Sequence, residues 1–423
     1  MEILKLIAKW TVIVLFCIIA LDAAAYAITA AMAHSARGAL LRETDLDLSK
    51  HRPANVPTEE VLDGRLREAA KPLFLFELKE FPKVLFNRGD VERVPEDVIA
   101  RYVAKLDTMA ETFDRIEELL ALPYYISHPT AVGAEDEDPD YWPIPNLIAA
   151  RGVVSCTCLA AGARAYSGDR DGAFRMLRIA RKMIERFREV KPYNLVSALC
   201  TASHVWMYAR AVSQVAKYAG DDPRCREHVE FLLGFHIKDS FLEALECGIA
   251  IFVAQFRRPT AWDRELHHVP AFYLATPLFN LDRRYYMRSW TRIISDWHKP
   301  TPELLRLYAL PSPDPPGLYL FSPYVGTDFC SIVSTAATTE AAVRLAACTV
   351  GIEEYRAKHG SLPKTLQDAP IVGGAETTTD PCTGQLLRYR LTGASYVLYS
   401  AGKDQLDSGG DIDRDLVWSR EAK

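Results

Sequence analysis

Leu398-Tyr-Ser-Ala-Gly-Lys-Asp404-Gln-Leu-Asp407-Ser-Gly-Gly-Asp411-Ile-Asp413-Arg-Asp415-Leu-Val-Trp418 is the most informative stretch of this chain. Four of the nine residues from 407 to 415 are aspartates, and two glycines lie among them. Carboxylates this close repel one another unless a cation lies between them, and hard oxygen ligands on a loop suit Ca²⁺. The stretch therefore predicts a small β-containing domain whose last loop is closed by calcium.

The alternative for the same aspartates is a solvated acidic tail, because runs of charge usually face water. Gly409, Gly410 and Trp418 favour the calcium loop, since a solvated tail has no need of them. An EF-hand is excluded, because position 12 counted from Asp411 is Ala422 rather than glutamate.

The residues before this loop predict a small α+β domain over 335–423. Apolar positions with helical spacing run from about Thr335 to His359, and Gly360 stands where a helix ends. Two strands are expected at 386–391 and 396–400, joined at Thr392-Gly393. The proline-rich stretch that begins at Pro311 predicts a linker and lead-in over 311–334.

Three motifs follow one another in this domain, and their order is informative. They are Ile352-Glu-Glu-Tyr-Arg-Ala-Lys-His-Gly360-Ser-Leu-Pro363, then Asp380-Pro-Cys-Thr-Gly384, then Tyr396-Val-Leu-Tyr-Ser-Ala-Gly-Lys-Asp404 with Gly409-Gly410 and Asp413 beyond it. The order resembles the periplasmic part of the type II secretion major pseudopilins. In that family a long helix carries a three-stranded sheet that a calcium loop closes.

The resemblance covers about 335–418 and implies a set of calcium ligands. By position these are the side chains of Asp404 and of Asp411 or Asp413, with backbone oxygens near Leu398 and Ala401 completing the shell. The chain departs from the family in two respects: nearly 300 residues of expected helical domain precede this helix, and no prepilin processing sequence is found. The protein is therefore not expected to polymerise as a pilin.

The composition is that of an ordinary globular protein with room for two or three domains. Of the 423 residues, 49% are hydrophobic and 25% are charged, which excludes a disordered chain. The net charge of −5 provides no field that attracts nucleic acid, so no such partner is expected. Most of the nine cysteines lie in apolar helical surroundings and are expected to be buried thiols, with a disulfide or two left open if the chain is exported.

The middle of the chain, 34–310, predicts an α-helical domain. Helical periodicity predicts helices over 98–120, from about Asn146, over 193–219 and over 227–256. A helical hairpin is expected over about 158–187, with its turn at Ser167–Gly172. Pro259, Pro270 and Pro277 then predict a less regular stretch. No second copy of the hairpin is found, so a repeat array is not indicated.

The N-terminal residues 1–33 predict a membrane anchor. Lys5 and Lys9 precede an apolar run from Trp10 to Ala33 that only Asp22 interrupts, and about 20 such residues cross a bilayer. The lysines are expected to stay in the cytoplasm, which places the bulk of the chain in the periplasm of a bacterial inner-membrane protein. Two alternatives remain: a signal peptide cleaved near Ala25-Tyr26-Ala27, and a buried first helix of a cytosolic protein.

The sequence carries no recognisable catalytic motif. Nucleotide-binding glycine loops, the zinc-protease motif and the nucleophile elbow are all missing, so we do not expect an enzyme. Glu246 lies beside an apolar stripe and is expected to pair with an arginine, and His267-His268 cannot easily share a metal. The alternatives are an envelope hydrolase that uses Glu246 and the Tyr141-Trp142 loop, or a protein that binds a peptide or lipid in a groove of the helical domain.

The stretch Arg283–His298 places arginines on one helical face and aromatic residues on another. Arg284, Arg288 and Arg292 share the first face, and Tyr286, Trp290 and Trp297 share the second. A helix on a membrane surface has this pattern, and so does any amphipathic helix that packs against a core. Packing is the interpretation that the pattern favours.

These observations predict a mainly α-helical, membrane-anchored periplasmic protein with a C-terminal pseudopilin-like α+β domain. A structural or scaffolding role in the envelope is expected, with the lipid bilayer and envelope proteins as partners and with a secretion or pilus-like assembly as its setting. Calcium acts in folding rather than in chemistry in this interpretation.

Overall fold

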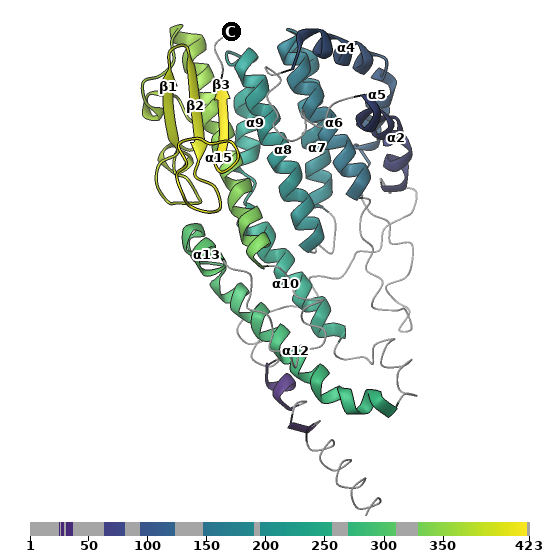
Figure 1. Ribbon diagram of the computed structural model, residues 1–423. Helices are drawn as coiled ribbons and strands as arrows, with labels where there is room; N and C mark the ends of the chain where they lie inside the picture. The colour runs from purple at the N-terminus through teal and green to yellow at the C-terminus, as the bar shows by residue number, and fades with distance from the viewer. Residues whose placement is uncertain are drawn as a thin grey trace, which may run out of the picture. The chain divides into compact units, whose positions relative to one another are not determined.

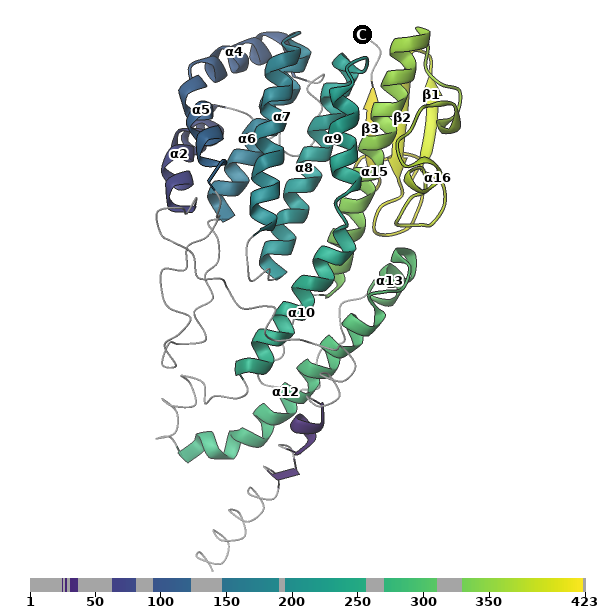
Figure 2. The same ribbon diagram turned by 180° about the vertical axis from the view of Figure 1, so that it is seen from behind.

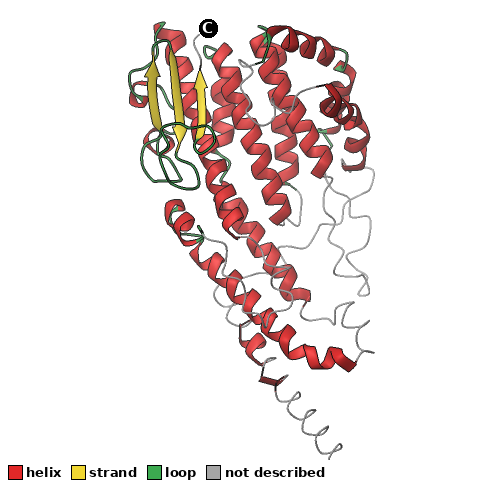
Figure 3. Cartoon of the chain, viewed as in Figure 1, coloured by secondary structure: helices red, strands yellow, loops and turns green. Residues whose placement is uncertain are grey.

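The computed structural model describes residues 25, 27, 28, 31–36, 63–80, 94–122, 147–189, 195–255, 270–309 and 329–420 (Figure 1). It is mainly helical with one small antiparallel sheet of three strands, which confirms the mainly α class and the small sheet (Figure 3). The predicted membrane anchor up to Ala24 and the linker prolines at 311–316 lie outside the described residues.

The chain forms two compact units. The smaller comprises 1–50, 245–298 and 310–329, and the larger comprises 51–244, 299–309 and 330–423. The helix α10 (Ile237–Gln255) contributes residues to both units. The C-terminal segment therefore belongs to the same compact unit as most of the helical middle of the chain.

The centre of the larger unit is the helix α6 (Leu147–Tyr166), which is apolar around most of its circumference. Small residues such as Ala149, Gly152 and Ala160 make up much of its buried surface, so neighbouring helices approach it closely. Among the described residues, α6 is the one helix long and apolar enough to cross a membrane, and most of it is buried within the protein.

The helices α7 (Arg170–Arg188) and α8 (Leu195–Ala219) pack beside α6. The predicted hairpin of α6 and α7 is confirmed, with Gly168 at a φ of 88° in the turn and the side chain of Asp169 accepting a hydrogen bond from the Gly172 amide. The remaining helices of the larger unit outside the C-terminal segment are α2 (Asp63–Glu80), α4 (Glu96–Asp107), α5 (Ala110–Leu119), α9 (Arg224–Leu233) and α13 (Thr301–Leu307).

Two helices predicted as continuous are interrupted. The stretch 98–120 divides into α4 and α5 at Thr108-Met109, and 227–256 divides into α9 and α10 after Gly234. Apolar periodicity continues across the first break because Leu106, Met109 and Phe113 are all buried. Pattern alone does not reveal a break when consecutive helices bury the same side.

The prediction of an irregular stretch around Pro270 and Pro277 was wrong. The helix α12 (Pro270–Asp296) begins at Pro270 and continues through Pro277. Proline suits the first position of a helix, where the missing amide hydrogen has no intrahelical partner. Residues 256–269, which contain Pro259 and both adjacent histidines, lie outside the described part.

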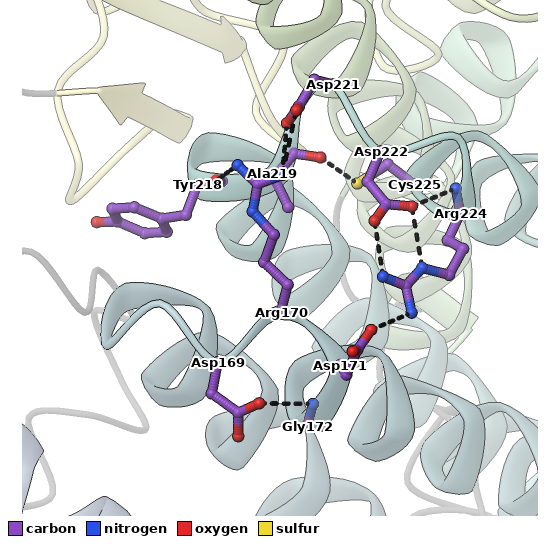
Figure 4. Close-up of polar contacts among 10 residues, drawn as sticks. All are labelled: Asp169, Arg170, Asp171, Gly172, Tyr218, Ala219, Asp221, Asp222, Arg224 and Cys225. Carbon is purple, nitrogen blue, oxygen red and sulfur yellow. Dashed lines mark hydrogen bonds and ion pairs between the residues drawn. The ribbon is translucent and has the colours of Figure 1, made fainter.

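Ion pairs join the start of α7 to the turn between α8 and α9 (Figure 4). The Arg224 guanidinium donates to Asp171 at 2.9 Å and to Asp222 at 2.7 Å, and Arg170 pairs with Asp221 at 3.0 Å. The hydrogen bonds from Arg224 hold the pKa of Asp222 below its ordinary value. These ion pairs fix the position of the N-terminus of α9 relative to α7.

The C-terminal segment consists of one long helix and the sheet (Figure 2). The helix α15 (Phe329–His359) begins six residues before the expected position, Thr335. It is followed by the short helices η4 (Leu366–Asp368) and α16 (Gly374–Thr377), and then by β1 (Arg388–Thr392), β2 (Ser395–Ser400) and β3 (Leu416–Arg420). The strands β1 and β2 confirm the predicted pair, and β2 is central because Leu398 pairs with Tyr389 on one side and with Trp418 on the other.

In the smaller unit, α12 buries its aromatic face. Trp290 is 2% exposed, and a Cβ atom at Gly248 would lie 2.8 Å from its ring. Phe329 meets the Trp290 ring edge-on at a centroid distance of 5.6 Å, and Ile293 and Trp297 are also buried. The packing interpretation of 283–298 is confirmed, and a membrane-surface role for the aromatic face is excluded.

The described cysteines are all free thiols, and most of them are buried. Burial raises the pKa of Cys348 and of Cys382 to about 12, so both are protonated at neutral pH. They behave as small core residues, as the sequence predicts for most of the cysteines.

The end of α8 contacts the C-terminal part of α15 so closely that only glycine fits. A Cβ atom at Gly220 would lie 2.8 Å from the Glu353 carbonyl oxygen, and backbone atoms cannot easily yield. We expect Gly220→Ala to lower the free energy of unfolding by about 1–3 kcal/mol, measured by urea denaturation. Gly234→Ala is the matched control, because its Cβ would meet the Glu230 carbonyl oxygen at an ordinary 3.4 Å. Equal stability of the two variants would contradict this close approach.

Candidate functional site

The acidic loop between β2 and β3, residues 401–415, is a folded structure rather than a solvated tail. The start of the loop is anchored by Asp380, which is 3% exposed. The Asp380 carboxylate accepts hydrogen bonds from the Ser400 hydroxyl at 2.8 Å and from the amides of Cys382 at 2.9 Å and Ala401 at 3.1 Å. A buried carboxylate with three donors ties the Asp380–Gly384 turn to the first residue of the loop.

Gln405 holds the next part of the loop in an uncommon backbone conformation. Its φ is 60°, the one positive value at a non-glycine position among the described residues. Its side-chain amide donates to the carbonyl oxygens of Pro302 at 2.9 Å and Cys382 at 2.6 Å. These two bonds offset the cost of the left-handed conformation and fix the loop against α13.

Asp407 closes the loop onto the sheet. Its carboxylate pairs with the Arg388 guanidinium of β1 at 2.9 Å and accepts from the Tyr399 hydroxyl at 3.0 Å and from the Gly409 amide at 2.9 Å. The hydrogen bond from Arg388 is the main reason that the pKa of Asp407 lies below its ordinary value. This carboxylate is neutralised by the protein itself.

Asp415 closes the far end of the loop. It is 5% exposed, and its carboxylate accepts from the amides of Gly410 at 2.7 Å and Ser408 at 3.3 Å. Gly410 has a φ of 84°, and a Cβ atom there would lie 3.3 Å from Val397. The glycine pair thus allows the loop to turn tightly over β2 so that its amides face Asp415.

The predicted ligands are placed unequally around this loop. Asp404, Asp411 and Asp413 are exposed, and Asp404 and Asp411 each use one carboxylate oxygen to accept from an amide two residues ahead, at 3.0 Å. Ala401 is buried, with its amide bonded to Asp380. Leu398 lies within the central strand, where its carbonyl belongs to the sheet.

Among the described residues, no group of three or more histidine, cysteine, aspartate or glutamate side chains is gathered as a metal-binding set. The structure places Asp404, Asp411 and Asp413 on one loop, while Leu398 and Ala401 lie at its base. Asp404 and Asp411 nonetheless have the ligand chemistry that a hard cation prefers, because each keeps a second carboxylate oxygen at the surface.

Sequence reasoning missed the residues that organise the loop. Asp380, Asp407 and Asp415 hold the loop closed through their hydrogen bonds, although none of them was predicted to be a calcium ligand. Asp380 had a detectable signal, since aspartate before proline in an Asp-Pro-x-x-Gly turn accepts nearby amides. The pairing of Asp407 with Arg388 spans 19 positions and has no such local signal.

The loop also exposes apolar side chains. Leu406 is 64% exposed and Ile412 is 38% exposed, and the nearby Leu386 and Leu391 are exposed as well. Single exposed apolar residues are common on protein surfaces. Here two of them lie on a loop whose backbone is fixed by side-chain hydrogen bonds, so they are presented in a defined geometry.

Polar groups elsewhere in the larger unit have structural surroundings. Burial lowers the pKa of His228 to about 4 and that of His204 to about 3, so both rings are neutral at pH 7. His228 contacts the Tyr208 hydroxyl, and His204 meets the Phe187 ring edge-on. Glu246 is half-buried in α10 of the smaller unit, and the Tyr141-Trp142 loop lies outside the described residues.

Comparison with protein-family models, with curated proteins and with solved structures finds no match to this chain. The assignment of function therefore depends on the geometry of the loop and on the chemistry of its residues.

The Arg388–Asp407 pair predicts a pH-dependent contribution to stability. Because the folded pKa of Asp407 lies below its unfolded value, the pair stabilises the protein at neutral pH and loses this effect as the pH falls through the folded pKa. We expect Arg388→Gln to lower the free energy of unfolding by about 0.5 kcal/mol at pH 7, since both groups are partly exposed. The difference should decrease as the pH falls below the ordinary range of aspartate and Asp407 becomes protonated, as measured by urea denaturation across the pH range.

Arg390→Gln is the control for this experiment, because Arg390 lies on the same strand and is exposed. Its effect on stability should be small at every pH. An Arg388→Gln effect that does not decrease as the pH falls below the ordinary range of aspartate would contradict the ion-pair explanation.

Proposed function

We propose that this protein is a membrane-anchored envelope protein with a structural role, and that its C-terminal loop is a contact surface for another envelope protein. The observation that carries the proposal is the exposure of Leu406 and Ile412 on a loop fixed by Asp380, Asp407 and Asp415. A preorganised apolar contact binds with little loss of conformational entropy.

The platform beneath the loop supports this role. Glu353 of α15 is fully buried, and its carboxylate accepts from the Tyr396 hydroxyl of β2 at 3.1 Å and pairs with Arg356 at 2.7 Å. Arg356 also donates to the Lys217 carbonyl oxygen of α8 at 3.3 Å. These contacts join the helical bundle, α15 and the sheet within the larger unit. The sheet that carries the loop is therefore anchored to the bundle.

The setting of this role comes from the sequence. The lysines before the apolar run favour a periplasmic location for the bulk of the chain, and the motif order resembles the type II secretion major pseudopilins. A secretion or pilus-like assembly is accordingly the setting that we propose for the partner. The long helical segment before α15 suits a protein that supports such an assembly rather than polymerising within it.

Calcium has a defined place in this proposal. Asp404 and one of Asp411 or Asp413 would supply carboxylate oxygens to Ca²⁺ at the exposed edge of the loop, and the ion would offset the repulsion between them. Arg388 already neutralises Asp407, and the amides of Ser408 and Gly410 donate hydrogen bonds to Asp415. Calcium thus adds stability to a loop that is closed at its two ends.

The contact surface is tested by site-specific photocrosslinking in intact cells that express the full chain. A photoreactive residue at position 406 or 412 should yield the same crosslinked partner, because both side chains lie on one loop. Ile148 is the control position, since it is apolar and 74% exposed on α6. Crosslinking at 406 and 412 no stronger than at 148 would rule out the loop as the contact surface.

The calcium assignment is tested by thermal unfolding of the detergent-solubilised full chain, with Ca²⁺ and with chelator. At a free concentration about 100 times the Kd, we expect Ca²⁺ to add about 2.7 kcal/mol and to raise Tm by roughly 3–4 °C. Asp404→Ala with Asp411→Ala should abolish the shift, whereas Asp97→Ala, a surface aspartate of α4, should leave it intact. If Ca²⁺ leaves the wild-type Tm unchanged, the loop is closed by protein groups alone.

A further inference from the structure

The smaller unit contains a cavity of about 840 Å³ whose two sides differ in chemistry. Arg284, Arg288 and Arg292 of α12 line one side. Ile28, Ala31 and Met32, from the last turns of the apolar N-terminal run, lie on the other. Figures 1 and 2 both place this short helical segment against α12.

The arginines form a row because they repeat every four residues and therefore share one helical face. The opposite face of α12 is buried through Met287, Trp290 and Ile293, which fixes the orientation of the row. Burial of the aromatic face leaves the arginine face as the one that a ligand can reach.

The row carries excess positive charge. None of the described residues that line the cavity is acidic. Arg292 lies 3.8 Å from Asp296 and remains 70% exposed, while Arg284 and Arg288 make no ion pair with any side chain that the structure describes. Adjacent guanidinium groups repel one another unless an anion lies between them, and guanidinium donors match phosphate oxygens in geometry.

The apolar side identifies the kind of anion. Ile28 is 61% exposed at the cavity, next to Ala31 and Met32. A free inorganic anion gains nothing from such residues, whereas a phospholipid offers both a phosphate and an acyl chain. An anionic lipid surface also attracts each nearby arginine by electrostatics.

The position of the cavity along the chain agrees with a lipid. This step depends on the proposed membrane anchor. A helix rises 1.5 Å per residue, so the apolar run from 10 to 33 spans roughly 35 Å, about the thickness of a bilayer core. Residues 34–36 would then emerge at the level of the lipid headgroups, with Ile28 and Met32 just inside the core, and the arginine row lines the same cavity.

We propose that this cavity binds the headgroup of an anionic phospholipid, with Arg284 and Arg288 contacting the phosphate and Ile28 and Met32 contacting the acyl chain. Arg292 contributes less to phosphate binding, because it also lies close to the Asp296 carboxylate. The lipid would set the depth and rotation of the smaller unit at the membrane surface.

The test compares phosphatidylglycerol with phosphatidylcholine added to the full chain in neutral detergent micelles, with bound lipid counted by native mass spectrometry. We expect the wild type to retain phosphatidylglycerol in preference to phosphatidylcholine. Arg284→Gln with Arg288→Gln should weaken the apparent affinity about 25-fold, at roughly fivefold per arginine. Arg67→Gln with Arg101→Gln, exposed arginines of α2 and α4, is the control with the same change in net charge.

Two results would overturn the lipid assignment. One is an equal loss in the control, which would indicate a general effect of net charge. The other is displacement of phosphatidylglycerol by millimolar inorganic phosphate, which would indicate a site for a small phosphate ligand. Circular dichroism of the double variant verifies that the fold is intact.

Flotation with vesicles of phosphatidylcholine alone tests the anchor separately. A chain that floats but shows no preference for phosphatidylglycerol in micelles contradicts the cavity proposal and leaves the anchor standing. A chain that fails to float but binds phosphatidylglycerol through Arg284 and Arg288 contradicts the anchor and supports the cavity.

Discussion

Much of the larger unit depends on one buried carboxylate. Glu353 is fully enclosed, and an ionised carboxylate in the interior is tolerated only when its oxygens are paired. Arg356 and Tyr396 supply those partners, and Arg356 extends the connection to the Lys217 carbonyl of α8. Removal of either partner would cost the buried carboxylate one of these contacts, so α8, α15 and β2 are constrained together. The absence of a side chain at Gly220, beside the Glu353 carbonyl, is what permits the two helices to come this close.

The acidic loop, residues 401–415, is held in place by the sheet and helices that Glu353 joins. Its aspartates divide into two kinds with different electrostatic roles. Asp380 and Asp415 are buried and accept backbone amides, and Asp407 is neutralised by Arg388. Asp404 and Asp411 remain exposed, with one oxygen each bonded to a nearby amide. The first kind fixes the backbone through protein groups, and the second kind and the side chains of Leu406 and Ile412 remain at the surface.

Local patterns in the sequence were sufficient to predict elements that are stabilised by local forces. The hairpin of α6 and α7, the strands β1 and β2, and the amphipathic character of 283–298 all follow from periodicity and turn chemistry. The break at Thr108-Met109 was not predictable, because apolar positions keep their spacing across it. The polar framework of the loop was missed for a different reason: Glu353 meets Tyr396 across 43 positions and Gln405 meets Pro302 across 103. Such pairs are set by tertiary packing, which a single sequence does not encode in any local pattern.

The helix α12 shows how one amphipathic pattern can serve two purposes that the sequence presents as alternatives. A helix that lies on a membrane would present its aromatic face to lipid, and a helix that packs would bury that face. Trp290 is buried against Gly248 and Phe329, so the aromatic face belongs to the protein. That burial holds Arg284 and Arg288 in a row beside Ile28, in a cavity whose described lining contains no acidic residue. Packing of the aromatic face and the proposed lipid contact are therefore compatible, because the first fixes the arginine face that the second would use.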